Sequence, residues 1–492
     1  STVDSEELDV SEYEIRSISS FEELNNLARE QIQSQRVSIF DWLFGESRIH
    51  TADVAAPESG AIVDSEQESH SSKTNVQVEG IDESDVVKND DRYLYIANFS
   101  ALTILDTQTK QIYTYQEEGF SPAEMYILED HIVLIGTKMH RYKQPSIYPI
   151  PGETEPDLGF FGRYYYYGFS SFALRVLDIS NLEDIQAIRS MEFPYGYHVN
   201  SRMIDQNLFL VLNTNRFYNY ENKEVYIPSY KDSIMSDEEI MLTEDQIKVI
   251  GTEGLWGFQL LVSFDVTAQE EAHVEAYVGY FENMYASKDN FYITKSVFKW
   301  IVQPVLEERA DDIDIETTTP PIEQPRYYDT TIVYRFEVVG DKLEYRKLVV
   351  VPGHILNQFS MDEHEDSFRI VTTATKLPDF SRETFAWSFD VTADKFVLQG
   401  SVGNMGIDER VYSVRFQNDL AYVVTFRDID PLYVVDFSNP EKLVVRSELK
   451  SPGVSDYLHL YNSGLLIGVG RDIDQFGRVL GVKISLFDVS NP

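Results

Sequence analysis

The sequence predicts an all-β protein, a β-propeller of seven recognisable four-stranded blades, with an eighth possible, behind a short helical N-terminal extension. Three observations lead to this prediction. The 492 residues include 31 Tyr and 29 Phe, aromatic residues that favour strands. A strand-like run that ends in Asp, followed closely by Ser or Thr, recurs along the chain. Upstream of these copies, pairs of apolar runs flank a tight polar turn, so one repeat holds four strands.

The composition divides the chain into three segments. Residues 1–49 form an N-terminal extension that is acidic at its start and contains one short helix. Residues 50–73 are rich in Ser, Glu and Gln, which predicts a flexible linker. Residues 74–492 carry all the repeats and are assigned to the propeller.

The helix of the extension is predicted from its start signal. Ser20 and Glu23 have the spacing of a capping box, in which each side chain satisfies a free backbone N–H of the first turn. Apolar residues then recur at helical spacing, which predicts a helix to about Gln33.

The recurring Asp marks a turn between two strands. Its carboxylate, helped by Ser or Thr, can accept hydrogen bonds from the backbone N–H groups of a chain that stops and reverses. A seventh copy carries Glu337 at this place. The six Asp copies are at Asp106, Asp178, Asp265, Asp390, Asp436 and Asp488.

Long insertions fall in one position of the repeat, between its second and third strands. They occupy about 138–170, 214–257 and 299–329. In a propeller this loop opens on the face that also carries the connections between blades, so one face should be elaborated and the Asp-turn face plain. Loops on a rigid scaffold commonly carry function.

The last repeat stops after its third strand, at Pro492. We expect either that an N-terminal strand, NVQVEG at 75–80, completes this blade and locks the ring, or that further chain follows. The chain begins with Ser1, which fits a processed protein and equally a cut chain.

Charge and cysteine content exclude several classes of function. The chain has 82 acidic and 41 basic residues, a formal net charge of -41, so nucleic acid and anionic membranes are unlikely partners. It has no Cys, which excludes disulfides, thiolate metal sites and cysteine nucleophiles. We find no membrane-spanning stretch, no catalytic motif, and therefore no catalytic residue or organic cofactor to name.

Acidic loops give the candidate metal site. Asp472 and Asp474 lie in a loop between a second and a third strand, and Asp428 and Asp430 occupy the matching place one blade earlier. Alternating Asp before Gly resembles the start of a calcium loop, although the complete twelve-residue pattern is missing. The alternative is that these carboxylates bind backbone N–H groups or neighbouring arginines.

The first repeat begins with a comparable acidic run at Asp82, Glu83, Asp85, Asp90 and Asp91. This run could also hold a metal, or its carboxylates could accept hydrogen bonds within the surrounding turns.

A tyrosine run gives the candidate binding site. Tyr164, Tyr165, Tyr166 and Tyr167 lie in the first insertion, where they could stack on sugars or grip a protein partner. Alternatively, they pack on the propeller and face solvent in turn.

Three stretches resemble a family of secreted proteins with a C-terminal β-propeller distantly related to WD repeats. They are TNVQVEGIDESDVVKNDDRYLYI (74–96), FRDIDPLYVVDFSNP (426–440) and GVGRDIDQFGRVLGVKISLFDVSNP (468–492). The resemblance implies export and residence at an archaeal or bacterial cell surface, and it implies no reaction. Members of that family continue past the position of Pro492, which leaves seven or eight blades open.

We therefore expect an extracellular or cell-surface module that presents its insertion-rich face to proteins or glycans, with calcium as a candidate stabilising ion. Two alternatives stay open. A hydrolase or lyase could use the propeller channel, where His198 and His459 lie near the start of predicted inner strands. A self-assembling surface component could exchange strands at the open last blade.

Overall fold

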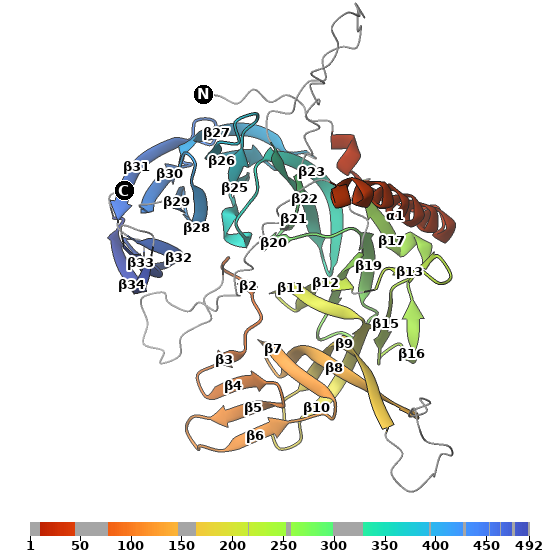
Figure 1. Ribbon diagram of the computed structural model, residues 1–492. Coiled ribbons are helices and arrows are strands. Elements are labelled where there is room, and N and C mark those ends of the chain that lie inside the picture. The colour runs from red at the N-terminus through yellow and green to blue at the C-terminus, as the bar shows by residue number, and fades with distance from the viewer. Residues whose placement is uncertain are drawn as a thin grey trace, which may run out of the picture.

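The computed structural model shows sheets arranged around a centre, as the blades of a propeller are (Figure 1). It describes residues 10–44, 77–145, 164–214, 216–251, 257–298, 328–392, 395–426, 430–451, 453–462, 464–474 and 478–490.

The first three blades follow in chain order. Blade 1 contains β3 (Val87–Asn89), β4 (Tyr93–Asn98), β5 (Ala101–Asp106) and β6 (Ile112–Tyr115). Blade 2 contains β7 (Phe120–Leu128), β8 (His131–Pro145), β9 (Tyr164–Asp178) and β10 (Gln186–Pro194). Blade 3 contains β11 (Gly196–Ile204), β12 (Asn207–Thr214), β18 (Phe258–Asp265) and β19 (His273–Val278).

Among the described residues, the later blades contain no inserted strand. Blade 4 contains β20 (Asn283–Ala286), β21 (Asn290–Phe298), β22 (Asp329–Val339) and β23 (Lys342–Pro352). Blade 5 contains β24 (Met361–His364), β25 (Ser367–Thr375), β26 (Arg382–Asp390) and β27 (Val397–Met405). Blade 6 contains β28 (Arg410–Gln417), β29 (Leu420–Phe426), β30 (Asp430–Asp436) and β31 (Val444–Ser451). In blade 7 the structure describes three strands, β32 (Val454–Asn462), β33 (Leu465–Ile473) and β34 (Val479–Asp488).

The all-β propeller is confirmed. The prediction of seven four-stranded blades is wrong for the last blade: in the described part of the chain, six blades have four strands and the seventh has three. Residues 77–80, part of the stretch expected to complete the last blade, form a bend and a turn instead. The next strand, β2 (Ile81–Asp82), pairs with β11 of blade 3. Within the described residues, the outer edge of β34 therefore has no partner strand.

The second insertion and the N-terminal extension widen two blades. β15 (Ser229–Asp232) and β16 (Ser236–Met241) continue blade 2 beyond β10. β17 (Ile247–Ile250) runs parallel to β19 of blade 3, and β1 (Ile15–Ser17) pairs with β17. The extension is thus part of the outer edge of blade 3. The remaining short elements are β13 (Tyr218–Asn219), β14 (Glu224–Val225) and the 3-10 turns η1 (Val10–Tyr13), η2 (Glu244–Gln246) and η3 (Gln358–Ser360).

Helix α1 (Phe21–Phe44) lies on the outside of the ring, beside the inserted strands (Figure 1). It is longer than the helix to Gln33 that the sequence predicted. Half of the predicted capping box forms: the N–H of Glu23 donates to the Ser20 Oγ at 3.2 Å. The Glu23 carboxylate instead accepts from the N–H of Ser19 at 2.7 Å. Leu24 is fully buried against the blades, so packing holds the helix in place.

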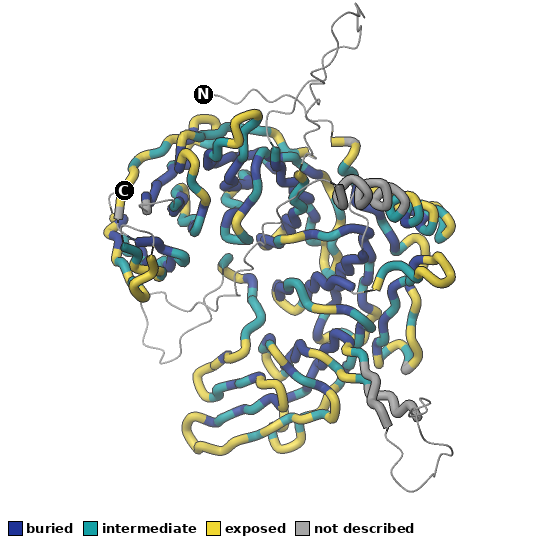
Figure 2. The backbone as a smooth tube through the Cα atoms, in the orientation of Figure 1, coloured by how far each residue is buried: buried dark blue, intermediate teal, exposed yellow. Residues whose placement is uncertain are grey.

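Each pair of successive blades encloses its own apolar core. Strand β8 shows how one strand serves two cores: Ile132 and Leu134 pack toward blade 1, while Val133 and Ile135 pack toward blade 3. This explains why blade strands have continuous apolar runs and not a clean alternation. Figure 2 shows the buried residues along the strands and the exposed ones at their ends. Six cores are found, one for each junction from blades 1–2 to blades 6–7.

The predicted Asp-turn chemistry is confirmed at all six Asp copies. Each carboxylate accepts a hydrogen bond from the backbone N–H two residues further on, as at Asp106 and Asp436 at 2.8 Å each. These bonds contribute to lowered carboxyl pKa values, and at Asp106 a backbone N–H is the largest cause. Glu337 differs: it binds Arg346 at 2.5 Å, and Gly340 forms a tight hairpin turn at a φ of 65°.

A buried ion pair fixes the inserted strands to blade 2. Arg189 of β10 binds Asp232 of β15 through Nε at 3.1 Å and Nη2 at 2.6 Å. Both side chains are at most 2% exposed. The guanidinium also lies 4.4 Å from the ring centre of Phe264 in blade 3. One interaction therefore joins an insertion and two blades.

Removing one partner of this pair should be costly. Asp232→Ala should lower the free energy of unfolding by about 3–5 kcal/mol, because Arg189 is left charged and buried. The double variant Arg189→Met/Asp232→Leu should cost less than Asp232→Ala alone, and urea unfolding measures both. Glu337→Ala, at the exposed pair with Arg346, is the control and should change stability little. If Asp232→Ala proved as mild as the control, the pair would not fix the insertion.

Candidate functional site

The predicted metal residues Asp472 and Asp474 lie at the end of β33 and just after it, and Asp474 binds the chain itself. Asp472 is exposed near the end of β33. Asp474 accepts from Arg478 Nε at 2.8 Å and from its backbone N–H at 3.0 Å. Asp428 and the side chain of Asp430 are outside the described residues. Among the described residues, no group of three or more His, Asp or Glu is placed to hold a metal. Calcium at these loops stays a prediction.

Two members of the acidic run of the first repeat, Asp82 and Glu83, lie beside basic side chains. Asp82 pairs with Lys88 at 2.6 Å, and Lys88 is 6% exposed. Burial raises the pKa of Asp82, and the nearby Lys88 opposes that shift. Glu83 lies 3.3 Å from Arg202 of β11. These charges tie the segment before β3 to the inner strands. Asp90 accepts hydrogen bonds from the backbone N–H groups of Arg92 and Tyr93 at 2.7 Å and 2.6 Å, which is the turn role that the sequence left open.

The tyrosine run continues the hairpin of β8 and β9. The backbone of Tyr164–Tyr167 pairs with residues 142–145, and the side chains of these tyrosines are outside the described residues. Their role in binding stays a prediction. Two positions further along β9, Phe169 is described, and its ring stacks on Tyr195 at 4.8 Å.

Phe169 belongs to a continuous stack of five side chains. The rings of His140 and Phe169 are 4.7 Å apart, and those of Phe169 and Tyr195 are 4.8 Å apart. The Arg216 guanidinium follows, 4.8 Å from the centre of the Tyr195 ring and 3.7 Å from that of Tyr226. Cation–π attraction favours this arrangement. Tyr195 is held with a φ of 59°, a left-handed conformation uncommon for a bulky residue.

The outer end of the stack lines a cavity of about 300 Å³. Its walls come from residues 194–195 between blades 2 and 3, from residues 214 and 216 after β12, and from residues 226–229. Glu239 and Met241 of β16 close it. The connection between blades and the insertion after β12 open on the same face of a propeller, so the cavity lies on the predicted insertion-rich face. The sequence located the 214–257 insertion but did not single out Arg216 or Tyr226.

His198 takes part in a hydrogen-bonded group that resembles a catalytic triad. Its Nε2 lies 3.0 Å from Ser201 Oγ, and its Nδ1 lies 3.7 Å from Glu124 Oε2. The second distance exceeds a hydrogen bond, and Glu124 accepts from Ser84 at 2.5 Å instead. Ser201 is 1% exposed and also accepts from the Tyr126 hydroxyl at 2.7 Å. Burial lowers the pKa of His198. A substrate has no direct access to this serine, so we interpret the group as structural.

His459 is part of a different blade. It is buried on β32, four blades further along the chain than the β11 strand of His198. Its Nδ1 lies 3.4 Å from the Tyr457 hydroxyl. The two histidines therefore belong to separate parts of the ring.

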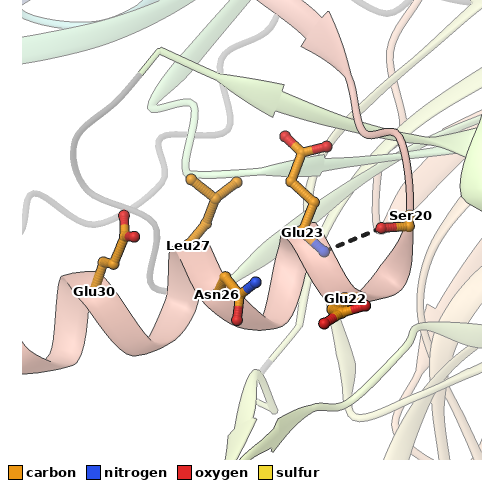
Figure 3. A pocket seen from close by; sticks show the side chains of 6 residues that line it. All are labelled: Ser20, Glu22, Glu23, Asn26, Leu27 and Glu30. Atoms are coloured by element: carbon orange, nitrogen blue, oxygen red, sulfur yellow. Dashed lines mark hydrogen bonds between the residues drawn. The ribbon is translucent and has the colours of Figure 1, made fainter.

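A hollow of about 360 Å³ follows the first turns of α1 (Figure 3). Acidic residues line it, and Figure 3 shows Glu23, Leu27 and Glu30 on one side of the helix. The Ser20 Oγ caps the helix, and Glu23 is bound by Ser19 and Arg16. The hydrogen bonds from Ser19 are the main reason that the pKa of Glu23 falls to about 2. We interpret the polar contacts at this hollow as the interactions that cap the N-terminus of the helix.

Comparison with known proteins agrees with the architecture. The family model described as a beta propeller domain matches residues 71–492, and the chain belongs to this family. An uncharacterised protein of Archaeoglobus fulgidus is 27% identical over 494 residues, which cover 85% of this chain and 69% of the relative. The uncharacterised protein MJ1554 of Methanocaldococcus jannaschii is 39% identical over 142 residues, 29% of this chain and 22% of that protein. Among the described residues, no helix is both long and apolar enough to cross a bilayer.

Proposed function

We propose that this propeller is a non-catalytic binding module of the cell exterior, which binds a protein or glycan through its insertion-rich face. The cavity beside Tyr195, Arg216 and Tyr226 carries this proposal, because it is built from insertions and blade connections on a rigid scaffold. Aromatic and arginine side chains are enriched where proteins bind partners. The acidic composition and the resemblance to secreted propellers support the extracellular location.

Replacing the outer tyrosine of the stack should weaken binding. Tyr226→Ala removes one wall of the cavity and should reduce affinity by at least about tenfold for a ligand that uses it. Immobilised glycans and biotinylated proteins from a cell-surface extract serve as probes, and bound protein is quantified. Tyr220→Ala is the matched control, because Tyr220 is 69% exposed on the same insertion and does not line the cavity. Equal binding by both variants would remove the cavity from the proposal.

We also propose that calcium stiffens the loops of Asp472 and Asp474 and of Asp428 and Asp430. An ion bound only by the folded state at 100 times its Kd stabilises that state by about 2.7 kcal/mol. Calcium should therefore raise the melting temperature relative to EDTA, and Asp472→Asn/Asp474→Asn should reduce the rise. No difference between calcium and EDTA would leave these carboxylates as turn formers.

Self-association is a second candidate function, favoured by the open side of blade 7. Val482, Ile484 and Leu486 of β34 are 80%, 69% and 67% exposed, and the strand edge beside them has no described partner. Unpaired strand edges with apolar side chains attract other strands. Light scattering should show assembly that grows with concentration and is abolished by Val482→Asp/Ile484→Asp. A wild-type protein that stays monomeric throughout would contradict this.

A further inference from the structure

We propose that the cavity of the insertion-rich face binds an acidic sugar, with Arg216 holding its carboxylate or sulfate group. This inference rests on the proposed function and gives the ligand a chemical class. It starts from the Arg216 guanidinium, which lies over the rings of Tyr195 and Tyr226, 4.8 Å and 3.7 Å from their centres.

The stack restricts how Arg216 can donate. The N–H groups of a guanidinium all lie in its own plane, so it donates hydrogen bonds along its edge while aromatic rings contact the group. Tyr195 in turn stacks on Phe169, and Phe169 stacks on His140, so one of the two rings beside Arg216 is held by further side chains. A planar fork of this kind matches the two oxygens of a carboxylate or sulfate.

The N–H groups of the Arg216 guanidinium are available to a ligand. No described residue forms a hydrogen bond or ion pair with the Arg216 guanidinium, although the side chain lines the cavity. Two other described arginines that lie over aromatic rings form ion pairs, Arg189 with Asp232 and Arg369 with Asp362, whereas Arg415 lies over Phe359 without a described one. In a chain with a net charge of -41, the Arg216 guanidinium supplies a positive charge beside the cavity.

The rest of the cavity favours a sugar as the carrier of the oxyanion. Glu239 accepts a hydrogen bond from Ser229, and both line the cavity as acceptors for ligand hydroxyl groups. The Glu239 carboxylate also repels ligands of high negative charge density at this end. Met241 and Ile227 add apolar surface, which suits the C–H face of a pyranose ring. One oxyanion beside several hydroxyls is the pattern of an acidic sugar.

The test compares sugars that differ only in charge. Oligogalacturonate is paired with its methyl ester, and sulfated malto-oligosaccharide with the unsulfated form. The wild-type protein should bind one acidic member more tightly than its neutral counterpart. Arg216→Gln should weaken that binding about tenfold to a hundredfold, as loss of a charged hydrogen-bond pair does. Arg216→Lys should weaken it nearly as much, because Lys lacks the fork. Arg410→Gln removes an exposed arginine at the start of β28 and should have no effect.

The other outcomes separate this inference from the proposed function. Equal affinity for acidic and neutral sugars, or unchanged binding by Arg216→Gln, would overturn the role of Arg216 and leave the cavity as a glycan site. Binding of a surface protein but of no sugar would overturn the sugar and leave the binding module. Binding of neither sugars nor surface proteins would end both proposals. Thermal unfolding of each variant shows whether a loss of binding comes from misfolding.

Discussion

The constraint on which the architecture depends is that each blade must bury two apolar faces, one against each neighbour. Six separate cores meet this requirement between blades 1 and 7, and no single core extends through the molecule. Since strand side chains alternate between the two faces, the buried apolar residues of a middle blade divide between two cores. Among the described residues, no core joins the two end blades to each other. Their outer faces leave Ile112 of β6 and Ile484 of β34 62% and 69% exposed.

Polar interactions then connect parts that these cores leave separate. The segment before β3 lies against the inner strands, where Asp82 pairs with Lys88 and Glu83 with Arg202. On the outer side, Arg189 and Asp232 fix the inserted β15 to blade 2. In each case, desolvated charges are tolerated because an opposite charge is close. The acidic residues of the first repeat thus support the fold, whereas the sequence allowed a metal site there.

The face that carries the insertions depends on the same scaffold. His140 and Phe169 come from a blade hairpin, Tyr195 from a blade connection, and Arg216 and Tyr226 from an insertion. The blades therefore bring together segments that lie far apart in the chain. The resemblance of His198 and Ser201 to catalytic residues is limited by burial, which shows why residue type and proximity alone do not define an active site.

The sequence by itself determined the propeller, the six Asp turns and the position of the insertions, because these depend on short-range periodicity and on side chains that bind their own backbone. It also indicated the start of α1 from Ser20. The tertiary structure decided the three-stranded last blade, the pairing of β2 with β11, and the docking of the extension on blade 3. It alone brought Tyr195, Arg216 and Tyr226 together. Such contacts join segments far apart in the chain, and a sequence pattern carries no information on which distant surfaces meet.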